Sequence, residues 1–345
     1  MSVEKKLMTT HNFCTLFDSN FLSRGLALFN SLMRYAPDSM LYVYCFDDLT
    51  LRILKQLSLP NLSMVSLAEF ESLELLEVKS SRSVGEYCWT CTPHIIRDAL
   101  VRFKLPAVTY LDADLYFFNS PAIVLDEWNN ADASVLITEH RYTPRYDNAN
   151  RFGIYCVQFI SFRNDSFGRY ALNWWADRCL EWCYAREEDG KFGDQKYLDD
   201  WTTRFQGVHV LQHLGGGVAP WNVQQYKVVS PHSAGIELRE LASGIQFPLL
   251  FYHFHGLQIF CDGEIDLATY PLGQDFRAEV YDTYLDGLRD SATLLNQVSS
   301  EKNFHGLRER PTGVMERLRA FKRRWERRFD GALNVQQVRN LIQLR

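Results

Sequence analysis

Short apolar runs alternate with amphipathic segments through the first half of the chain. Runs rich in β-branched and aromatic residues predict strands over residues 12–17, 41–46, 62–67, 107–111, 133–138 and 155–162. Between the first two strands, apolar residues recur at helical spacing at Leu22, Leu26, Phe29 and Met33. Strands that alternate with helices predict an α/β fold with a mixed, mostly parallel sheet and helices on both faces.

Two later helices also have sequence signals. Thr92 followed by Pro93 is typical of a helix start, because threonine caps the first turn and proline fits the first helical position. We predict that a helix begins there and ends before Pro106. Apolar residues between Ala171 and Trp182 predict a long helix after the last strand.

The composition describes a globular protein with a large core. The chain has 345 residues, of which 46% are hydrophobic, and this length suffices for one α/β domain with an appendage. We expect a domain over residues 1–275 and a C-terminal helical region over 276–345. The formal net charge of −5 argues against nucleic acid as a partner, because nucleic-acid binders usually carry a clear basic excess.

Targeting signals and cysteine spacing point to a cytoplasmic protein. The first ten residues lack the apolar stretch of a signal peptide, and no run approaches the roughly 18 apolar residues that span a bilayer. The eight cysteines are expected to be reduced thiols. Cys88 and Cys91 form a lone C-x-x-C pair without a second pair at zinc spacing, so a structural role is favoured over a metal site.

One acidic pair stands at a position where α/β sheets bind ligands. Asp112 and Asp114 follow the strand over residues 107–111 and precede a second apolar run. Aspartates in turns often only cap the backbone, but apolar runs on both sides distinguish this pair from an ordinary surface turn. Carboxylates suit Mg²⁺ and Mn²⁺, which can neutralise a leaving diphosphate. The pair is therefore a candidate site for a divalent cation, and such a cation would suit a reaction in which a diphosphate leaves.

Four segments, in order along the chain, carry a family resemblance. They are LFDSNFLSRGLALFNSL (16–32), TYLDADLYFFNSP (109–121), FGDQKYLDDW (192–201) and YHFHGLQIF (252–260). Over roughly residues 12–260 the chain resembles GT-A glycosyltransferases, and it is most similar to the glycogenin-like and bacterial galactosyltransferase-like retaining enzymes of family 8. The family usually continues its late segment with Lys-Pro-Trp, whose lysine contacts the diphosphate. Here Leu257 follows Gly256, so a basic contact must come from elsewhere or be missing.

The resemblance implies a metal site and a nucleotide site. Asp112, Asp114 and His253 would hold Mn²⁺ (or Mg²⁺), and His255 competes with His253 for the third position. The remaining residues expected to contact the donor are Phe17 and Asp18 at the base, Arg97 at the diphosphate or sugar, and Gly256 in the His-x-x-Gly motif.

The resemblance also implies the reacting residues. Asp194 and Gln195 would lie near the anomeric carbon, and this pair favours a retaining mechanism. If Asp194 were instead a base that deprotonates the acceptor, the enzyme would be inverting. In the segment HLGGGVAPWN (213–222), three glycines allow close approach of a ligand and Trp221 is a candidate for stacking on a sugar. A tight turn with a packed tryptophan is the alternative.

The C-terminal part is basic. After Arg308 arginines and lysines predominate, and Val314, Leu318 and Phe321 continue an apolar stripe at helical spacing. Such a basic amphipathic helix binds an anionic membrane surface or packs on the main domain. The first alternative would give the protein a peripheral place on the inner face of the cytoplasmic membrane.

The function that follows is transfer of a hexose from a nucleotide-diphosphate sugar to a glycan or lipid-linked acceptor, as in synthesis of lipopolysaccharide or other polysaccharides. The resemblance implies a UDP-sugar. Two alternatives remain: a nucleotide-sugar hydrolase or pyrophosphorylase with the same metal pair, and a non-catalytic glycan-binding protein with the same fold.

Overall fold

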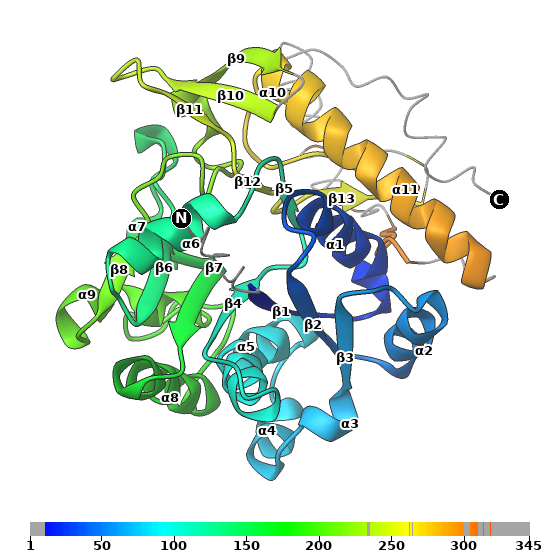
Figure 1. Ribbon diagram of the computed structural model, residues 1–345, viewed down its shortest axis with the longest axis vertical. Coiled ribbons are helices and arrows are strands. Elements are labelled where there is room, and N and C mark those ends of the chain that lie inside the picture. The colour runs from blue at the N-terminus through cyan, green and yellow to red at the C-terminus, as the bar shows by residue number, and fades with distance from the viewer. Residues whose placement is uncertain are drawn as a thin grey trace, which may run out of the picture.

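A seven-stranded mixed sheet forms the centre of the computed structural model, which describes residues 11–232, 235–261, 263, 265–299, 304–309, 313 and 318. The strand order is β3-β2-β1-β4-β7-β6-β8 (Figure 1). The strands are β1 (Asn12–Phe17), β2 (Met40–Cys45), β3 (Leu62–Ser66), β4 (Ala107–Leu111), β6 (Val135–Glu139), β7 (Tyr155–Arg163) and β8 (Val208–Val210). Only β7 runs antiparallel to its neighbours, so the predicted mixed, mostly parallel sheet is confirmed.

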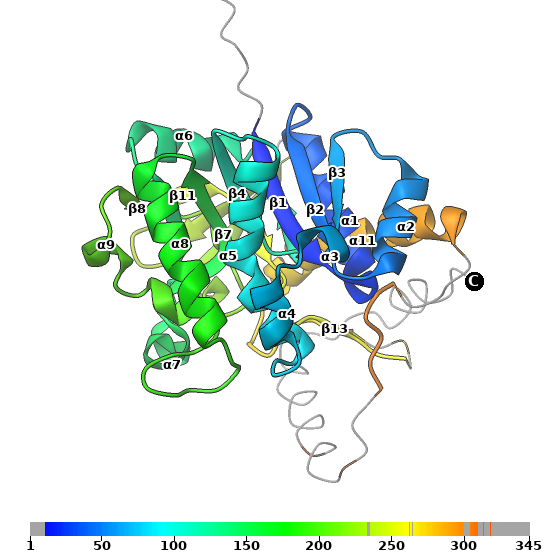
Figure 2. The ribbon, with the colours of Figure 1, turned by 90° about the horizontal axis from the view of Figure 1, so that it is seen from below.

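Helices cover both faces of this sheet, as predicted (Figures 1 and 2). On one face lie α5 (Val84–Arg102) and α8 (Ser166–Glu181), and on the other α1 (Leu22–Tyr35), α2 (Asp48–Leu57) and α11 (Asp282–Val298). Shorter helices are α3 (Leu67–Phe70), α4 (Leu73–Lys79), α6 (Ala122–Asn130), α7 (Ala149–Phe152), α9 (Trp201–Arg204) and α10 (Gln274–Phe276). Each face therefore has its own hydrophobic cluster.

Strand β1 shows why a central strand has apolar residues on both of its faces. Successive side chains of a strand point to opposite faces. Phe13 and Phe17 join the cluster beneath α1, whereas Cys14 and Leu16 join the cluster beneath α5. Because helices bury both faces, no alternation of polar and apolar residues remains in the sequence of this strand.

Helix α5 begins earlier than the sequence analysis predicted. Ser83 is its N-cap, and Ser83 and Glu86 form a capping box. Thr92 and Pro93 lie inside the helix, where the Thr92 hydroxyl donates to the carbonyl of Cys88 at 3.1 Å. The prediction of a helix start at Thr92 was wrong, and the Ser83-x-x-Glu86 pattern was the signal for the true one.

A second layer of strands, which the sequence analysis did not predict, lies beside the main sheet. Its parts are β5 (Leu115–Phe117), β9 (Tyr226–His232), β10 (Gly235–Glu240), β11 (Gln246–Pro248), β12 (Phe251–His253), β13 (Gln258–Ile259) and β14 (Ile265–Asp266). Strands β9, β10 and β11 form one small antiparallel sheet, and β5 pairs with β12. Tyr252, Phe254 and Tyr284 of α11 belong to the cluster that joins this layer to the helices.

The described C-terminal part packs onto the rest of the chain. After a π-helical turn over Arg277–Tyr281, α11 places Leu295 in the cluster that it shares with α1. Residues 304–309 form a short strap: the carbonyl of Phe304 accepts from the backbone N–H of Ser23 at 3.1 Å, and the N–H of Arg308 donates to the carbonyl of Ile259 at 2.9 Å. The predicted basic helix lies mostly outside the described residues.

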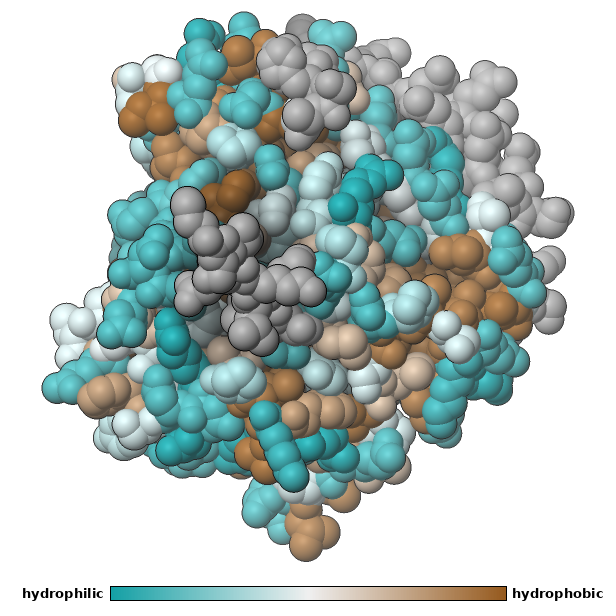
Figure 3. All heavy atoms as spheres, in the orientation of Figure 1, coloured by the Kyte–Doolittle hydropathy of each residue, from teal (hydrophilic) through white to brown (hydrophobic). Residues whose placement is uncertain are grey.

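The surface is mostly polar on the face that Figure 3 shows. Figure 3 shows hydrophilic residues over much of one face, with hydrophobic residues gathered in separate groups. Of the helices within the described residues, none is both long enough and apolar enough to cross a lipid bilayer.

Candidate functional site

Asp112 and Asp114 lie at the C-terminal end of β4, beside the end of its parallel neighbour β1. The backbone N–H of Asp112 donates to the carbonyl of Gln158 at 2.9 Å, and the carbonyl of Asp112 accepts from the N–H of Leu115 at 3.1 Å. These bonds fix the turn between β4 and β5. The two carboxylates keep 30% and 20% of their surface exposed and remain accessible to a ligand.

His253 reaches the carboxylates through strand pairing. It ends β12, whose antiparallel register with β5 sets it opposite Leu115. Its Nε2 atom lies 3.1 Å from Oδ1 of Asp114 and 3.7 Å from Oδ2 of Asp112. The imidazole is 5% exposed, so packing holds it in one orientation.

These groups alter one another's protonation. Burial raises the pKa of Asp112 to about 6, because the pull of His253 does not offset burial and the repulsion of Asp114. Burial also acts on Asp114, but the charge and hydrogen bond of His253 outweigh it and lower that pKa to about 2. Burial lowers the pKa of His253, but the charge of Asp114 and its hydrogen bond raise it by more. The pKa of His253 therefore lies well above its ordinary value. Without a bound cation, His253 is the main cationic group that offsets the two carboxylates, and the charges of His255 and Arg24 add to the low pKa of Asp114.

The donor atoms suit a divalent cation. One ligand atom each from Asp112, Asp114 and His253 lie within 4.8 Å of one another. Two carboxylate oxygens with one imidazole nitrogen match Mn²⁺ and also accommodate Mg²⁺. The other ring nitrogen of His253, Nδ1, is buried without a hydrogen-bond partner, and the Cys156 thiol lies close enough to influence the ring. This arrangement leaves Nε2 as the atom that faces the carboxylates.

His255 and Gly256 continue beyond β12. The side chain of His255 is exposed, and its ring centroid lies 5.5 Å from that of His253. The structure therefore brings His253, and not His255, into the cluster with the two aspartates. Gly256 has φ +77°, and Leu257 closes the turn by donating to the carbonyl of Phe254 at 3.2 Å. Glycine is required here for its backbone conformation.

Asp194 lies near the same cluster although it is distant in sequence. Its side chain is 5% exposed, and the indole N–H of Trp175 donates to its backbone carbonyl at 2.9 Å. Burial raises the pKa of Asp194, and the charge of Asp112 raises it further. The neighbouring Gln195 donates its side-chain amide to the carbonyl of Phe152 at 2.8 Å, which fixes the orientation of that side chain.

Phe17 and Asp18 differ in how much they offer a ligand. The Phe17 ring is 3% exposed and packs so closely on Gly25 that a Cβ there would lie 2.4 Å from it. Its side chain is thus part of the core. Asp18 is half-buried and caps a 3-10 turn by accepting from the N–H of Asn20 at 3.0 Å.

Arg97 lies on α5, and its guanidinium bonds to His94 rather than to the candidate metal site. Its guanidinium forms a hydrogen bond with Nδ1 of His94 at 3.1 Å, while the other ring nitrogen of His94 bonds to the carbonyl of Ala176 on α8. These contacts join α5 to α8. They do not include Asp112, Asp114 or His253.

Trp221 packs against His253. The indole is 4% exposed, donates to the carbonyl of His140 at 2.9 Å and packs edge-on against His253 with ring centroids 5.4 Å apart. So enclosed a ring fits the second of the two interpretations from the sequence, a tight turn with a packed tryptophan. Gly215 likewise serves packing, because a Cβ there would lie 1.9 Å from the carbonyl oxygen of Pro248.

Two residues at the site were missed by the sequence analysis. Tyr110 is 4% exposed and its hydroxyl interacts with Thr92 and Asp112. Arg24 of α1 is 4% exposed and its charge contributes to the low pKa of Asp114. Neither has a sequence signal, because each resembles an ordinary core or surface position of its strand or helix.

The fold and the site together define an α/β protein with a candidate divalent-metal centre at the C-terminal edge of its sheet. No protein-family model matches the chain. It is 31% identical over 270 residues to the uncharacterized protein YfnD of Bacillus subtilis (strain 168), a match that covers 76% of this chain and 83% of YfnD. It is 34% identical over 264 residues to the uncharacterized protein YfnF of the same strain, with 74% and 84% covered. The chain belongs to the family of these two proteins.

Among solved structures, the chain is similar to several glycosyltransferases. The galactosyltransferase LgtC, solved with donor and acceptor sugar analogues, gives a TM-score of 0.48 at 14% identity over 84% of this chain and 97% of LgtC. Mouse xyloside xylosyltransferase 1 gives 0.44 at 13% identity over 72% and 98% of the two chains. GlyE of Streptococcus pneumoniae TIGR4 gives 0.46 at 13% identity over 84% and 63%.

Proposed function

We propose that this protein is a GT-A glycosyltransferase that moves a hexose from a nucleotide-diphosphate sugar, UDP being the expected nucleotide, to a glycan or lipid-linked acceptor. The observation that carries the proposal is the convergence of Asp112, Asp114 and His253 at the end of β4. The first two come from the Asp-x-Asp segment and the third from the His-x-x-Gly segment, which resemble the metal-binding parts of this enzyme class.

In this proposal the three side chains hold Mn²⁺ (or Mg²⁺). When bound, the cation would neutralise the charge that develops on the departing diphosphate. Asp112 and Asp114 supply anionic oxygens, and the buried His253 supplies a nitrogen whose orientation is fixed by packing. Because ligand atoms must be deprotonated to bind a cation, protons on Asp112 and His253 would have to leave before binding.

Asp194 and Gln195 supply the sugar-binding side of the proposed site. Gln195 is an amide and cannot act as a base, and Asp194 is buried with a raised pKa. A buried acid of this kind is suited to donate a hydrogen bond to a sugar hydroxyl, while a general base must first lose its proton. We therefore propose retention at the anomeric carbon.

A screen of nucleotide sugars tests the function. Release of UDP or GDP is measured with and without Mn²⁺, in the presence of glycan acceptors, for the native chain and for Asp114→Ala. We expect metal-dependent release for one donor, and a loss of at least about 100-fold in Asp114→Ala because a charged ligand is removed. Equal release without any acceptor would identify a hydrolase. Binding of glycans with no release in any condition would identify a non-catalytic protein.

We also propose that the basic segment beyond residue 309 brings the enzyme to an anionic membrane, where a lipid-linked acceptor resides. Truncation after residue 309 keeps the strap that packs on β13 and α1. Sedimentation with anionic vesicles then compares the two chains. Equal binding of the full and truncated chains would rule out this membrane role.

A further inference from the structure

Arg24 is a buried cation in the first part of α1. It is 4% exposed, and both of its hydrogen bonds go to neutral backbone carbonyls: Nη1 donates to that of His305 at 2.8 Å and Nη2 donates to that of Leu257 at 3.3 Å. The guanidinium also lies over the ring of Phe21, with 4.6 Å to the centroid. Burial of a charge is costly unless an anion compensates it, and carbonyl groups offset only part of that cost.

The hydrogen bonds of Arg24 connect it to the candidate metal site. Phe254, next to His253, donates its N–H to the carbonyl of Asp114 at 3.0 Å. The same residue accepts from Leu257 at 3.2 Å, and the carbonyl of Leu257 accepts from Arg24. The turn after His253 is thus tied at one end to the backbone of Asp114 and at the other to the guanidinium of Arg24.

His305, which lies beside Arg24, has a ring nitrogen without a hydrogen-bond partner. Nδ1 of His305 is buried without a hydrogen bond, while the backbone carbonyl of the same residue accepts from Arg24. Burial, followed by the nearby charge of Arg24, lowers the pKa of His305 to about 4, so this ring is neutral at pH 7 and can still donate one hydrogen bond. An anion bound near Arg24 would offer it an acceptor.

We propose, building on the glycosyltransferase function above, that Arg24 supplies the positive charge that binds the diphosphate of the donor. The chain has Leu257 where the resembled family continues with a lysine-containing segment, and Arg24 is hydrogen-bonded to the carbonyl of that same Leu257. A guanidinium suits this task because its fork of N–H groups binds two phosphate oxygens at once. A cation from α1 thereby takes the place of one from the late segment.

Arg82 provides a matched control. It is 9% exposed, donates to the carbonyl of Leu180 at 2.9 Å and lies over the ring of Tyr184 at 4.2 Å. Its bonding therefore resembles that of Arg24, but its partners belong to α5 and to the end of α8 rather than to the turn after His253. Substitution of either arginine removes a buried cation from carbonyl partners, and only Arg24 is proposed to bind phosphate.

The experiment compares Arg24→Gln, Arg24→Lys and Arg82→Gln. Calorimetry measures the affinity for UDP with Mn²⁺, and ligand-observed NMR measures the affinity for uridine, which has the same base and ribose without phosphate. We expect Arg24→Gln to lower the affinity for UDP by about tenfold or more and the affinity for uridine by less than about twofold, because only the charged contact with phosphate is lost. Arg24→Lys should lie between, and Arg82→Gln should leave the ratio of the two affinities unchanged.

Several results would overturn the proposal. Equal weakening of UDP and uridine in Arg24→Gln would assign Arg24 a structural role, as would unchanged UDP affinity. If Arg24→Gln does not fold, Arg24→Met is measured in its place, because methionine removes the charge and keeps an unbranched side chain; an unchanged ratio of UDP to uridine affinity in that variant decides against the proposal. Inorganic pyrophosphate with Mn²⁺ separates the two proposals. Arg24-dependent pyrophosphate binding without UDP binding would refute only the nucleotide assignment, and binding of neither ligand would refute both.

Discussion

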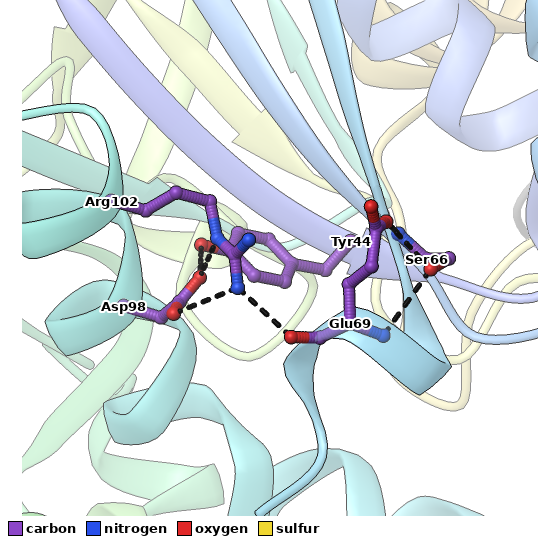
Figure 4. Close-up of polar contacts among 5 residues, drawn as sticks. All are labelled: Tyr44, Ser66, Glu69, Asp98 and Arg102. Carbon is purple, nitrogen blue, oxygen red and sulfur yellow. Dashed lines mark hydrogen bonds and ion pairs between the residues drawn. The ribbon is translucent and has the colours of Figure 1, made fainter.

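Two groups of acidic side chains in this protein are built in opposite ways. At the junction of β2, α3 and α5, Asp98 accepts from the hydroxyl of Tyr44 at 2.7 Å and from Nε of Arg102 at 2.7 Å (Figure 4). Arg102 also donates to the carbonyl of Glu69 at 2.9 Å, and the carboxylate of Glu69 accepts from the Ser66 N–H in a capping box. Each charged group there has a matching partner.

At the end of β4 the acids are less well compensated. Asp114 raises the pKa of Asp112, and Asp112 raises that of Asp194; His253 lowers the pKa of Asp112 and Asp114, and Arg24 adds to the low pKa of Asp114. Clustered acids with shifted pKa values are typical of functional sites, because selection for ligand binding opposes selection for stability there. The Asp98 group thus holds helices to the sheet, whereas the Asp112 group is arranged so that it could bind a cation.

The largest effect is expected from Asp194→Asn, which tests whether the less compensated group performs the reaction. The amide keeps the shape but replaces the carboxyl O–H that is proposed to bond to the sugar with a weaker N–H donor, so turnover should fall by about 100-fold or more. Affinity for UDP with Mn²⁺ should change by less than about threefold, because Asp194 is proposed to contact the sugar and not the cation. Asp200→Asn, which alters an exposed ion pair with Arg204, is the control. Unchanged turnover in Asp194→Asn would remove Asp194 from the mechanism.

The next effect is on stability and concerns the compensated group. Asp98→Ala leaves the hydroxyl of Tyr44, which is 1% exposed, without its acceptor and should lower the free energy of unfolding by about 2 kcal/mol. Denaturant unfolding measures this, with Asp177→Ala as an exposed control on the middle of α8. UDP affinity should stay the same. A loss of UDP binding together with unchanged stability would reverse the roles of the two groups.

A third effect is a pH dependence of metal binding. The raised pKa values of Asp112 (about 6) and His253 mean that both bind protons that a cation must displace. In the range below pH 6, the affinity for Mn²⁺ should therefore increase by about tenfold or more for each unit by which the pH is raised. Calorimetry in two buffers of different ionisation enthalpy measures the released protons. A pH-independent affinity with no proton release would show that the cation binds elsewhere.

The smallest effect is a gain of stability on removing an acid. The folded pKa of Asp112 lies above its ordinary value of 3.8, so the metal-free folded chain loses stability as pH rises from about 4 to about 6. Asp112→Asn should then raise the melting temperature by about 1 to 3 °C at pH 7.5 and leave it unchanged at pH 4. Thermal unfolding in a chelator tests this. A lower melting temperature at pH 7.5 would mean that Asp112 stabilises the fold, as Asp98 does.

Local patterns in the sequence were enough to predict the class of fold and the location of the acidic pair. Mostly apolar runs such as 12–17 and 107–111 are strands in the structure with the same bounds, because a strand buried on both faces is apolar at most positions rather than at alternate ones. The pair Asp112 and Asp114 could be placed at a strand end for the same reason. Local patterns carry this information, since each element is specified by neighbouring residues.

Only the tertiary structure decided which distant residues meet that pair. His253 rather than His255 faces the carboxylates because the register of β12 with β5 sets it opposite Leu115, and a register is not written in either strand alone. Trp221 was expected at an open sugar site and is buried, because the loop that carries it packs against His140 and His253. Arg24 reaches the turn after His253 through bonds that join residues 24, 257 and 305. Contacts over such separations depend on how the elements pack, and packing involves the whole chain at once.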